Sequence, residues 1–444
     1  MKNLLKSFDR WDLFLSIALF FTFVAVSFLP FAPKKFGDEV FHREAKKVSE
    51  FAHGAATSDQ VVVSRAPGPV IFYSVPYLLI TPGSFDDSYW SVGFVWTFFW
   101  MLIVLLLVRR SARNLFGDRA GLLAAFATVL IPFNVYYSYG NSAEPVAYLG
   151  TAIAIYGWSR LNSVSSSLSG LTLFSVGLFV LVISRPNAIF LIPIGIAILL
   201  FFGKKSFRNH RQGLLALACV AAAFFGTFFL LSLQSKAWQS GNFAHVFFHG
   251  RFQFRTEPWD WRYWDDKSRQ GSKDHELFTR TEEQIVTEIE KSGKSLEELK
   301  GEWATNDFIS NPLITVQQFG IRLMTLNLSL VNSKSAKDFR FGPIEGKIAY
   351  TLFHILVNAL SVAVIFSALV FLVRNKNSVV GLWPLWGVWF SLLLFHALIY
   401  SEPRYLFPGQ PGLVVLASGI WSDWSSRVIS IGTSPDQVQS SRYA

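Results

Sequence analysis

Long, uninterrupted runs of apolar residues are the feature that most restricts how this chain can fold. The first run covers residues 11–31, where Asp12 is the only charged side chain and lies near the edge. A helix of about 20 apolar residues is long enough to cross a bilayer core of roughly 30 Å. Because only helices and closed barrels satisfy their backbone hydrogen bonds in lipid, such runs predict a bundle of membrane-spanning helices.

The sequence predicts an all-α polytopic membrane protein with about ten transmembrane helices. Tryptophans at the ends of these segments, Trp158 and Trp383 among them, are expected to anchor the helices at the membrane–water interface. The predicted ranges are 11–31, 88–108, 119–140, 143–161, 167–184, 186–203, 213–235, 350–374, 378–400 and 405–425.

Basic residues indicate how these segments are oriented. Lys2 and Lys6, the cluster "RRSAR" (109–113) and the cluster "KKSFRNHR" (204–211) lie at alternate ends of the predicted segments. The positive-inside rule then places both termini in the cytoplasm. The formal net charge of +10 is therefore an orientation signal, and we expect no nucleic-acid partner.

Two long polar segments are expected on the outer side of the membrane, a first loop at 32–87 and an outer domain at 236–349. Each contains a short or interrupted apolar stretch, 69–82 and 312–332, which we expect to lie as a juxtamembrane helix on the outer face. The chain is thus divided into a membrane core with the first loop (1–235), the outer domain (236–349), C-terminal transmembrane helices (350–425) and a cytoplasmic tail (426–444).

The outer domain is expected to be small and mainly helical. "SLEELKGEW" has Ser295 and Glu298 at the spacing of a capping box, which predicts a helix start. "TEEQIVTEIEK" places Ile285, Val286 and Ile289 on one helical face, which predicts an amphipathic helix.

Carboxylates gather at the predicted outer surface. The polar motifs expected there are "GDEVFHRE" (37–44), "YGNSAEP" (139–145), "ISRPN" (183–187) and "YSEPRYLFP" (400–408). Asp38 or Glu39, with Glu144 across the bundle, could deprotonate a hydroxyl or hold a divalent ion. The same acids also stand where helices start and could simply cap them, and both interpretations stay open.

Three arginines, Arg65, Arg185 and Arg404, share this predicted surface. Arginine at headgroup depth often only extends its charge toward water. Together, however, three guanidinium groups would fit a phosphate, because their donors match phosphate oxygens. His42 lies four residues after Asp38 and either orients that carboxylate or is a surface histidine.

Taken together, these motifs resemble those of the GT-C superfamily of integral-membrane glycosyltransferases. The nearest resemblance is to bacterial relatives of the protein O-mannosyltransferases and of the aminoarabinose transferase that modifies lipid A. "GDEVFH" is similar to an acidic motif after the first span, and "SRPNAIFLIP" and "EPRYLFPGQP" to later arginine motifs. "RAPGPVIFY" departs from the family by placing Gly68 between two prolines, and "SAEP" by inserting Ala143. The resemblance covers roughly 1–235 and 340–425, but not 236–311.

The resemblance implies an enzyme that moves a sugar, with inversion, from a polyprenyl-phosphate-linked donor to a hydroxyl of a lipid, glycan or protein acceptor. It implies an integral protein of the bacterial inner membrane, surrounded by lipid, whose site faces the periplasm or exterior. No cofactor is certain, and a requirement for a divalent cation stays open. The implied roles are Asp38 as catalytic base with Glu39 second, Glu144 and His42 as support for the acceptor or an ion, and Arg65, Arg185, Arg404 and Tyr405 as binders of the lipid phosphate.

Two other classes of protein stay open. An O-antigen-type polymerase or ligase with a diphosphate-linked donor would also need outer arginines and a large outer loop. It does not predict two adjacent carboxylates directly after the first span. A transporter or lipid scramblase predicts ionisable residues near the bilayer midplane, whereas most charges here lie at the ends of the spans.

Overall fold

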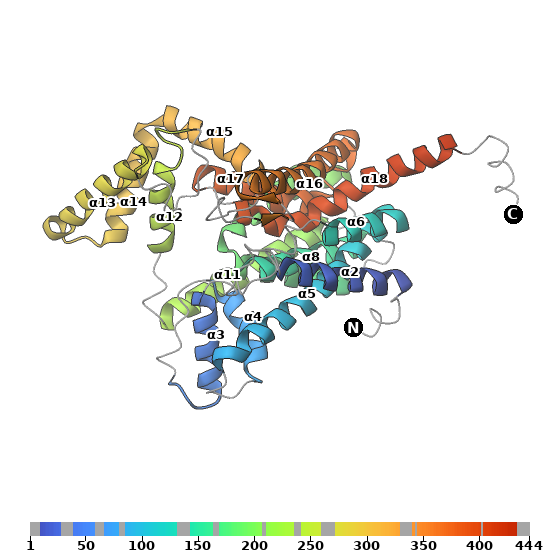
Figure 1. Ribbon diagram of the computed structural model, residues 1–444, viewed down its shortest axis with the longest axis horizontal. Helices are drawn as coiled ribbons and strands as arrows, with labels where there is room; N and C mark the ends of the chain where they lie inside the picture. The colour runs from blue at the N-terminus through green and yellow to red at the C-terminus, as the bar shows by residue number, and fades with distance from the viewer. Residues whose placement is uncertain are drawn as a thin grey trace, which may run out of the picture.

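The computed structural model of the protein is almost entirely helical (Figure 1). It contains a helix within every range predicted to span the membrane. The described residues are 9–27, 39–57, 66–79, 85–130, 143–162, 168–206, 210–234, 241–258, 271–328, 340–341, 344–400 and 403–432. The bundle helices are α2 (Arg10–Ser27), α5 (Phe85–Phe116), α6 (Asp118–Leu130), α8 (Ala143–Asn162), α9 (Leu168–Ser184), α10 (Leu191–Ser206), α11 (His210–Gln234), α16 (Gly346–Arg374), α17 (Trp383–Leu398) and α18 (Gln410–Gly432).

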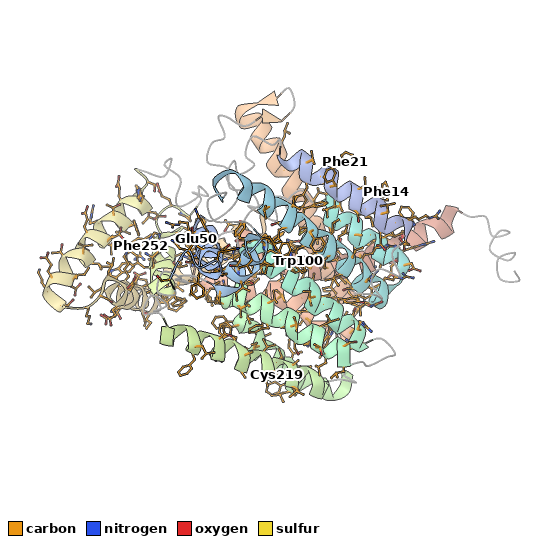
Figure 2. All side chains as sticks on the ribbon, turned by 90° about the horizontal axis from the view of Figure 1, so that it is seen from below. Phe14, Phe21, Glu50, Trp100, Cys219 and Phe252 are labelled. Carbon is orange, nitrogen blue, oxygen red and sulfur yellow. The ribbon has the colours of Figure 1, made fainter. Side chains whose placement is uncertain are left out.

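Apolar length varies among these helices. Within the described residues, one segment, Val95–Phe116 of α5, is long and apolar enough to cross a membrane by length and composition. Shorter apolar stretches of 10 to 17 residues occur in other bundle helices. On α2, Phe14 is 52% and Phe21 64% exposed, and Figure 2 shows both on the outside of the bundle. Exposed aromatic side chains of this kind are typical of a surface that faces lipid.

Helices α8 and α9 pack tightly against each other. A Cβ atom added to Gly177 of α9 would overlap the backbone of Ala154 on α8, so no larger residue fits there. Small residues at such contacts let transmembrane helices approach closely and pack along their whole length. The two helices are consecutive in the chain. The contact of Glu144 with Arg185 shows that the start of α8 lies beside the end of α9.

Two tryptophans overturn the prediction that they anchor helices at the interface. Trp158 and Trp383 are both fully buried, and their ring centroids lie 5.9 Å apart. The Trp158 indole Nε1 donates a hydrogen bond of 2.9 Å to the carbonyl oxygen of Gly381. Both lie near a helix end, but neighbouring helices enclose the end of α8 and the start of α17 there, so neither ring is exposed.

A buried ion pair fixes the start of α2. The Arg109 guanidinium of α5 pairs with Asp12, which is 2% exposed, and its Nη2 lies 2.8 Å from Asp9 Oδ2. Asp9 also caps α2, because its Oδ1 accepts from the backbone N–H of Trp11 at 2.8 Å. Hydrogen bonding to Arg109 lowers the pKa of Asp9 to about 2. Arg109 therefore holds the start of α2 in place, in addition to contributing to the positive charge that predicts orientation.

The remaining helices lie outside the bundle. They are α3 (Glu39–Ala52), α4 (Pro67–Tyr77), α12 (Gly241–Phe252), α13 (Lys273–Ser292), α14 (Leu296–Ser310) and α15 (Pro312–Leu328), and a short hairpin pairs β1 (Arg340–Phe341) with β2 (Ile344–Glu345). Figure 1 shows α12, α13 and α14, here named the projecting domain, at one end of the bundle. The start of α2 and the end of α18 lie toward the other end.

The projecting domain has its own hydrophobic core, which includes Phe248, Phe252 and Ile285. The capping box of Ser295 and Glu298 is confirmed at the start of α14. The helix predicted from "TEEQIVTEIEK" is found within α13, where Ile285 is buried, Ile289 packs against the same cluster and Val286 is 51% exposed. Neighbouring positions on a helix differ by about 100° in direction, so Ile285 and Val286 can differ in burial.

Candidate functional site

An acid and an arginine from two predicted motifs meet where α8 begins and α9 ends. The Arg185 Nη2 atom pairs with Glu144 Oε1, and the side chain of Glu144 is only 2% exposed. Glu144 is in the first turn of α8, as expected for an acid near a helix start. Arg185 directly follows α9 and precedes the short 3-10 helix η2 (Pro186–Phe190). The close packing of α8 on α9 therefore brings together two side chains that are 41 residues apart.

Tyr405 joins this pair from the C-terminal motif. The guanidinium carbon of Arg185 lies 4.9 Å from the centroid of the Tyr405 ring, a cation–π distance. On Tyr405 the His396 ring stacks with a centroid distance of 4.2 Å and an interplanar angle of 28°. Tyr405 belongs to the 3-10 helix η6 (Pro403–Gly409), which precedes α18. The predicted motifs "ISRPN" and "YSEPRYLFP" are thus in contact.

His396 is held in one tautomer. Asn187 Nδ2 lies 2.6 Å from His396 Nε2, and His396 Nδ1 lies 3.2 Å from the carbonyl oxygen of Tyr400. An amide nitrogen can only donate, so Nε2 accepts and the ring proton stays on Nδ1. His396 is not among the site residues predicted from sequence. The sequence feature that could have indicated a functional role is its position: His396 is an ionisable residue inside an apolar run, four positions before the "YSEPRYLFP" motif.

The structure explains why a glycine stands at position 68, between the two prolines where this sequence departs from the family pattern. A Cβ atom at this position would collide with Ser184 Oγ and lie 3.0 Å from the Ser184 backbone nitrogen. Without a side chain at Gly68, the first turn of α4 can contact the end of α9, directly beside Arg185. The "RAPGPVIFY" segment therefore lies next to the Glu144–Arg185 pair.

The first acidic motif reaches the same place. Phe41 of α3, Val70 of α4 and Ala143 of α8 form one small buried cluster. Phe41 comes two residues after Glu39, so the start of α3 lies beside the start of α8. The motifs that the sequence places on one surface therefore meet at one end of the bundle.

Several predicted site residues lie outside the described part. Asp38 and Arg65 are not described, and for Glu39, His42 and Arg404 only the helix that carries each one is described. Their roles stay predictions. The structure brings together Glu144, Arg185 and Tyr405 from the predicted set, and it adds Asn187 and His396.

Buried polar atoms surround the Glu144–Arg185 pair. Among the residues that the structure describes, no hydrogen-bond partner is found for Tyr148 OH, Ser184 Oγ or Asn187 Oδ1. Tyr148 is fully buried one helical turn after Glu144, and its ring stacks on Phe407 at 4.3 Å. An unpaired buried polar atom costs about 1–3 kcal/mol, so such a cluster is typical of a site where a ligand supplies the missing partners.

The sequence leaves open whether the protein requires a divalent cation. Within the described residues no group of three or more His, Cys, Asp or Glu side chains is placed to hold a metal ion. The Glu144 carboxylate is engaged by the Arg185 cation instead. The described side chains therefore do not form the carboxylate set that Ca²⁺ or Mg²⁺ prefers.

The fold and this site define a mainly helical bundle with an acid–arginine pair at the end that carries the projecting domain. Residues 79–229, which include both Glu144 and Arg185, match the sequence model of the family described as Dolichyl-phosphate-mannose-protein mannosyltransferase. This match confirms the resemblance to the GT-C glycosyltransferases. Comparison with the sequences of curated proteins finds no match for this chain.

The solved structures that match this chain include two of archaeal oligosaccharyltransferases and one of ArnT. An oligosaccharyltransferase of Archaeoglobus fulgidus tethered to an acceptor peptide with the NVT sequon is 14% identical, with a TM-score of 0.48 over 93% of this chain and 49% of that one. AglB of Archaeoglobus fulgidus with an inhibitory peptide and a dolichol-phosphate is 13% identical, with a TM-score of 0.46 over 96% and 52%. ArnT of Cupriavidus metallidurans bound to undecaprenyl phosphate is 13% identical, with a TM-score of 0.39 over 92% and 76%.

This chain spans about half the length of the two archaeal proteins. With TM-scores below 0.5, these likenesses say nothing of the chemistry of this chain.

Proposed function

We propose that this protein moves a sugar from a polyprenyl-phosphate-linked donor to an acceptor hydroxyl on the outer face of the membrane, with inversion at the anomeric carbon. The observation that carries the proposal is the meeting of the predicted motifs around the Glu144–Arg185 pair. The family match over the segment that contains this pair supports it.

The reaction needs a base for the acceptor and a cation for the leaving group. In the proposed step, the carboxylate of Asp38, or of its neighbour Glu39, takes the proton of the acceptor hydroxyl. The acceptor oxygen forms a bond to the anomeric carbon from the face opposite the phosphate. The bond between that carbon and the phosphate oxygen breaks, and the polyprenyl phosphate leaves with the electron pair. A phosphate is already a good leaving group, so this step requires no general acid.

Arg185 is the described side chain best suited to the leaving phosphate. Its guanidinium is held from one side by Glu144 and from another by the Tyr405 ring, which fixes its position before the donor arrives. We therefore propose that Glu144 serves the reaction by orienting Arg185. Arg65 and Arg404 complete the phosphate site in this proposal, from the segments that adjoin it.

The proposed topology has ten membrane spans, with both termini in the cytoplasm of a bacterial cell and the site on the periplasmic side. A helix in every predicted range supports it. The positions of the chain ends also support this topology. The start of α2 and the end of α18 both lie away from the projecting domain (Figure 1).

Sugar transfer by the purified protein tests the function. Synthetic polyprenyl-monophosphate and polyprenyl-diphosphate sugars are each supplied with extracts of cell-envelope acceptors, and released polyprenyl phosphate or diphosphate is measured. Release from the monophosphate donor alone is the expected result. Release from the diphosphate donor alone would point to the polymerase or ligase class. Asp38→Asn and Glu39→Gln variants test the base, and full activity in both would overturn that assignment.

A further inference from the structure

One buried arginine joins the projecting domain to the bundle. Arg322 of α15 is only 1% exposed, and its Nη1 donates to the carbonyl oxygens of Leu398 at 3.0 Å and Ala397 at 3.3 Å. Its Nη2 donates to the carbonyl oxygen of Gly250. Gly250 is in the last turn of α12, and Ala397 and Leu398 are the last two residues of α17.

The chemistry of helix ends explains why an arginine serves here. The last carbonyl groups of a helix have no partner within the helix, and they carry the negative end of its dipole. A guanidinium has donors in a fixed planar fork and keeps its charge when buried. Arg322 thus satisfies carbonyl groups of two helix ends, those of α12 and α17, with one side chain.

The two helix ends are also in direct contact. A Cβ atom added to Gly250 would overlap the carbonyl oxygen of Ile399. Gln318, one turn before Arg322 on α15, donates to the carbonyl oxygens of Arg251 and Gln253 at 2.9 Å each. The end of α12 is therefore held against the residue that follows α17, at a distance that only glycine permits.

The segment after α17 belongs to both the projecting domain and the candidate site. Tyr400 is buried in the same hydrophobic cluster as Phe248 and Phe252 of α12. Its carbonyl oxygen accepts the hydrogen bond from His396, and His396 stacks on Tyr405 beside Arg185. A shift of α12 relative to α17 would therefore move the wall of the candidate site.

We propose that Arg322 and Gly250 are positioning residues, which set how far an acceptor bound at the projecting domain lies from the Glu144–Arg185 pair. The inference rests on the proposed function. The projecting domain is the natural place for the acceptor, because it adjoins the site and lies outside the segment that matches the family. The donor, in contrast, is held by residues of the bundle.

Two variants and one matched control test the proposal in the full-length protein. Gly250→Ala forces α12 away from Ile399, and Arg322→Met removes the three carbonyl bonds. Gly320→Ala is the control, because it lies on the same helix as Arg322 and an added Cβ meets nothing within 4 Å. A misplacement of about 1 Å can cost on the order of 100-fold in rate. For both variants we therefore expect kcat/KM for the acceptor to fall on the order of 100-fold.

The other readouts separate positioning from a general loss of structure. Binding of polyprenyl phosphate, measured by native mass spectrometry, is expected to stay within about twofold of the unaltered protein, which is about 0.4 kcal/mol in binding free energy. Hydrogen exchange of the amides from 397 to 409 is expected to speed up in Gly250→Ala and Arg322→Met, but not in Gly320→Ala. A parallel loss of lipid binding, or unchanged exchange in Gly250→Ala, would overturn the proposal. Since lipid binding and exchange need no turnover, they decide the matter even if sugar transfer itself is not found.

Discussion

Replacing Glu144 by glutamine would remove the charge partner of Arg185 while keeping the size of the side chain. The Glu144 side chain is buried at 2% exposed, and the Arg185 side chain is partly buried at 15%. Removing one partner of a buried ion pair costs about 3–5 kcal/mol, because the other charge loses its ion partner. We therefore expect Glu144→Gln to lower the free energy of unfolding by about 3–5 kcal/mol.

The double variant Glu144→Gln with Arg185→Met separates stability from activity. In the double variant two neutral side chains replace the ion pair, so much of the lost stability is expected to return. Sugar transfer is expected to stay absent, since Arg185 is the proposed phosphate ligand. Thermal unfolding in detergent micelles, followed by intrinsic tryptophan fluorescence, gives the stability of the two single variants and the double variant.

One pattern would refute this reasoning. If the double variant were as unstable as the sum of the single variants, the two side chains would act independently, and the ion pair would not be the source of the effect. Glu298→Gln in the exposed capping box is a control for the loss of one carboxylate outside the bundle.

Three further changes have expected outcomes. Gly68→Ala should lower the free energy of unfolding by about 1–3 kcal/mol through overpacking at the end of α9, whereas Gly226→Ala, with open space around its Cβ, should not; melting temperatures compare the two. Tyr148→Phe should lower kcat/KM and leave the melting temperature equal or higher, because it removes a hydroxyl without a partner among the described residues. The pKa of Asp9 is lowered to about 2, so its contribution is complete above the unfolded value of about 4 and is lost as the pH falls from about 4 to 2. Asp9→Asn should remove that part of the acid dependence of unfolding; an unchanged acid limb would show that hydrogen bonding to Arg109 does not set it.

The helices could be predicted from sequence because membrane-spanning segments need a minimum length of apolar residues. The range 143–161 predicts α8, found at Ala143–Asn162, and 167–184 predicts α9, found at Leu168–Ser184. Helix ends agree well where a proline or a charge stops the apolar run. They agree less well for α17, because the predicted range 378–400 begins at the last residue of a 3-10 helix (η5, Lys376–Ser378) and α17 itself starts only at Trp383.

Side-chain partners were harder to predict, because they depend on which helices become neighbours. Glu144 and Arg185 were each singled out by motif, yet nothing in the sequence shows that they pair. Trp158 was assigned to the interface from its place near a helix end, but burial depends on the surrounding helices and not on depth alone. His396 was overlooked because a single histidine in an apolar run has no motif of its own.

The helical hairpin of α8 and α9 makes the site depend on length. From Glu144 to the end of α8 the chain rises about 27 Å at roughly 1.5 Å per residue, and α9 returns over a similar distance to Arg185. Inserting or deleting one residue within either helix would shift and rotate one charged group away from the other. A change of length between Asn162 and Leu168, at the far end of the hairpin, leaves both helices in register. A tag inserted between the two helices is therefore expected to disturb the Glu144–Arg185 pair less than one inserted within either helix.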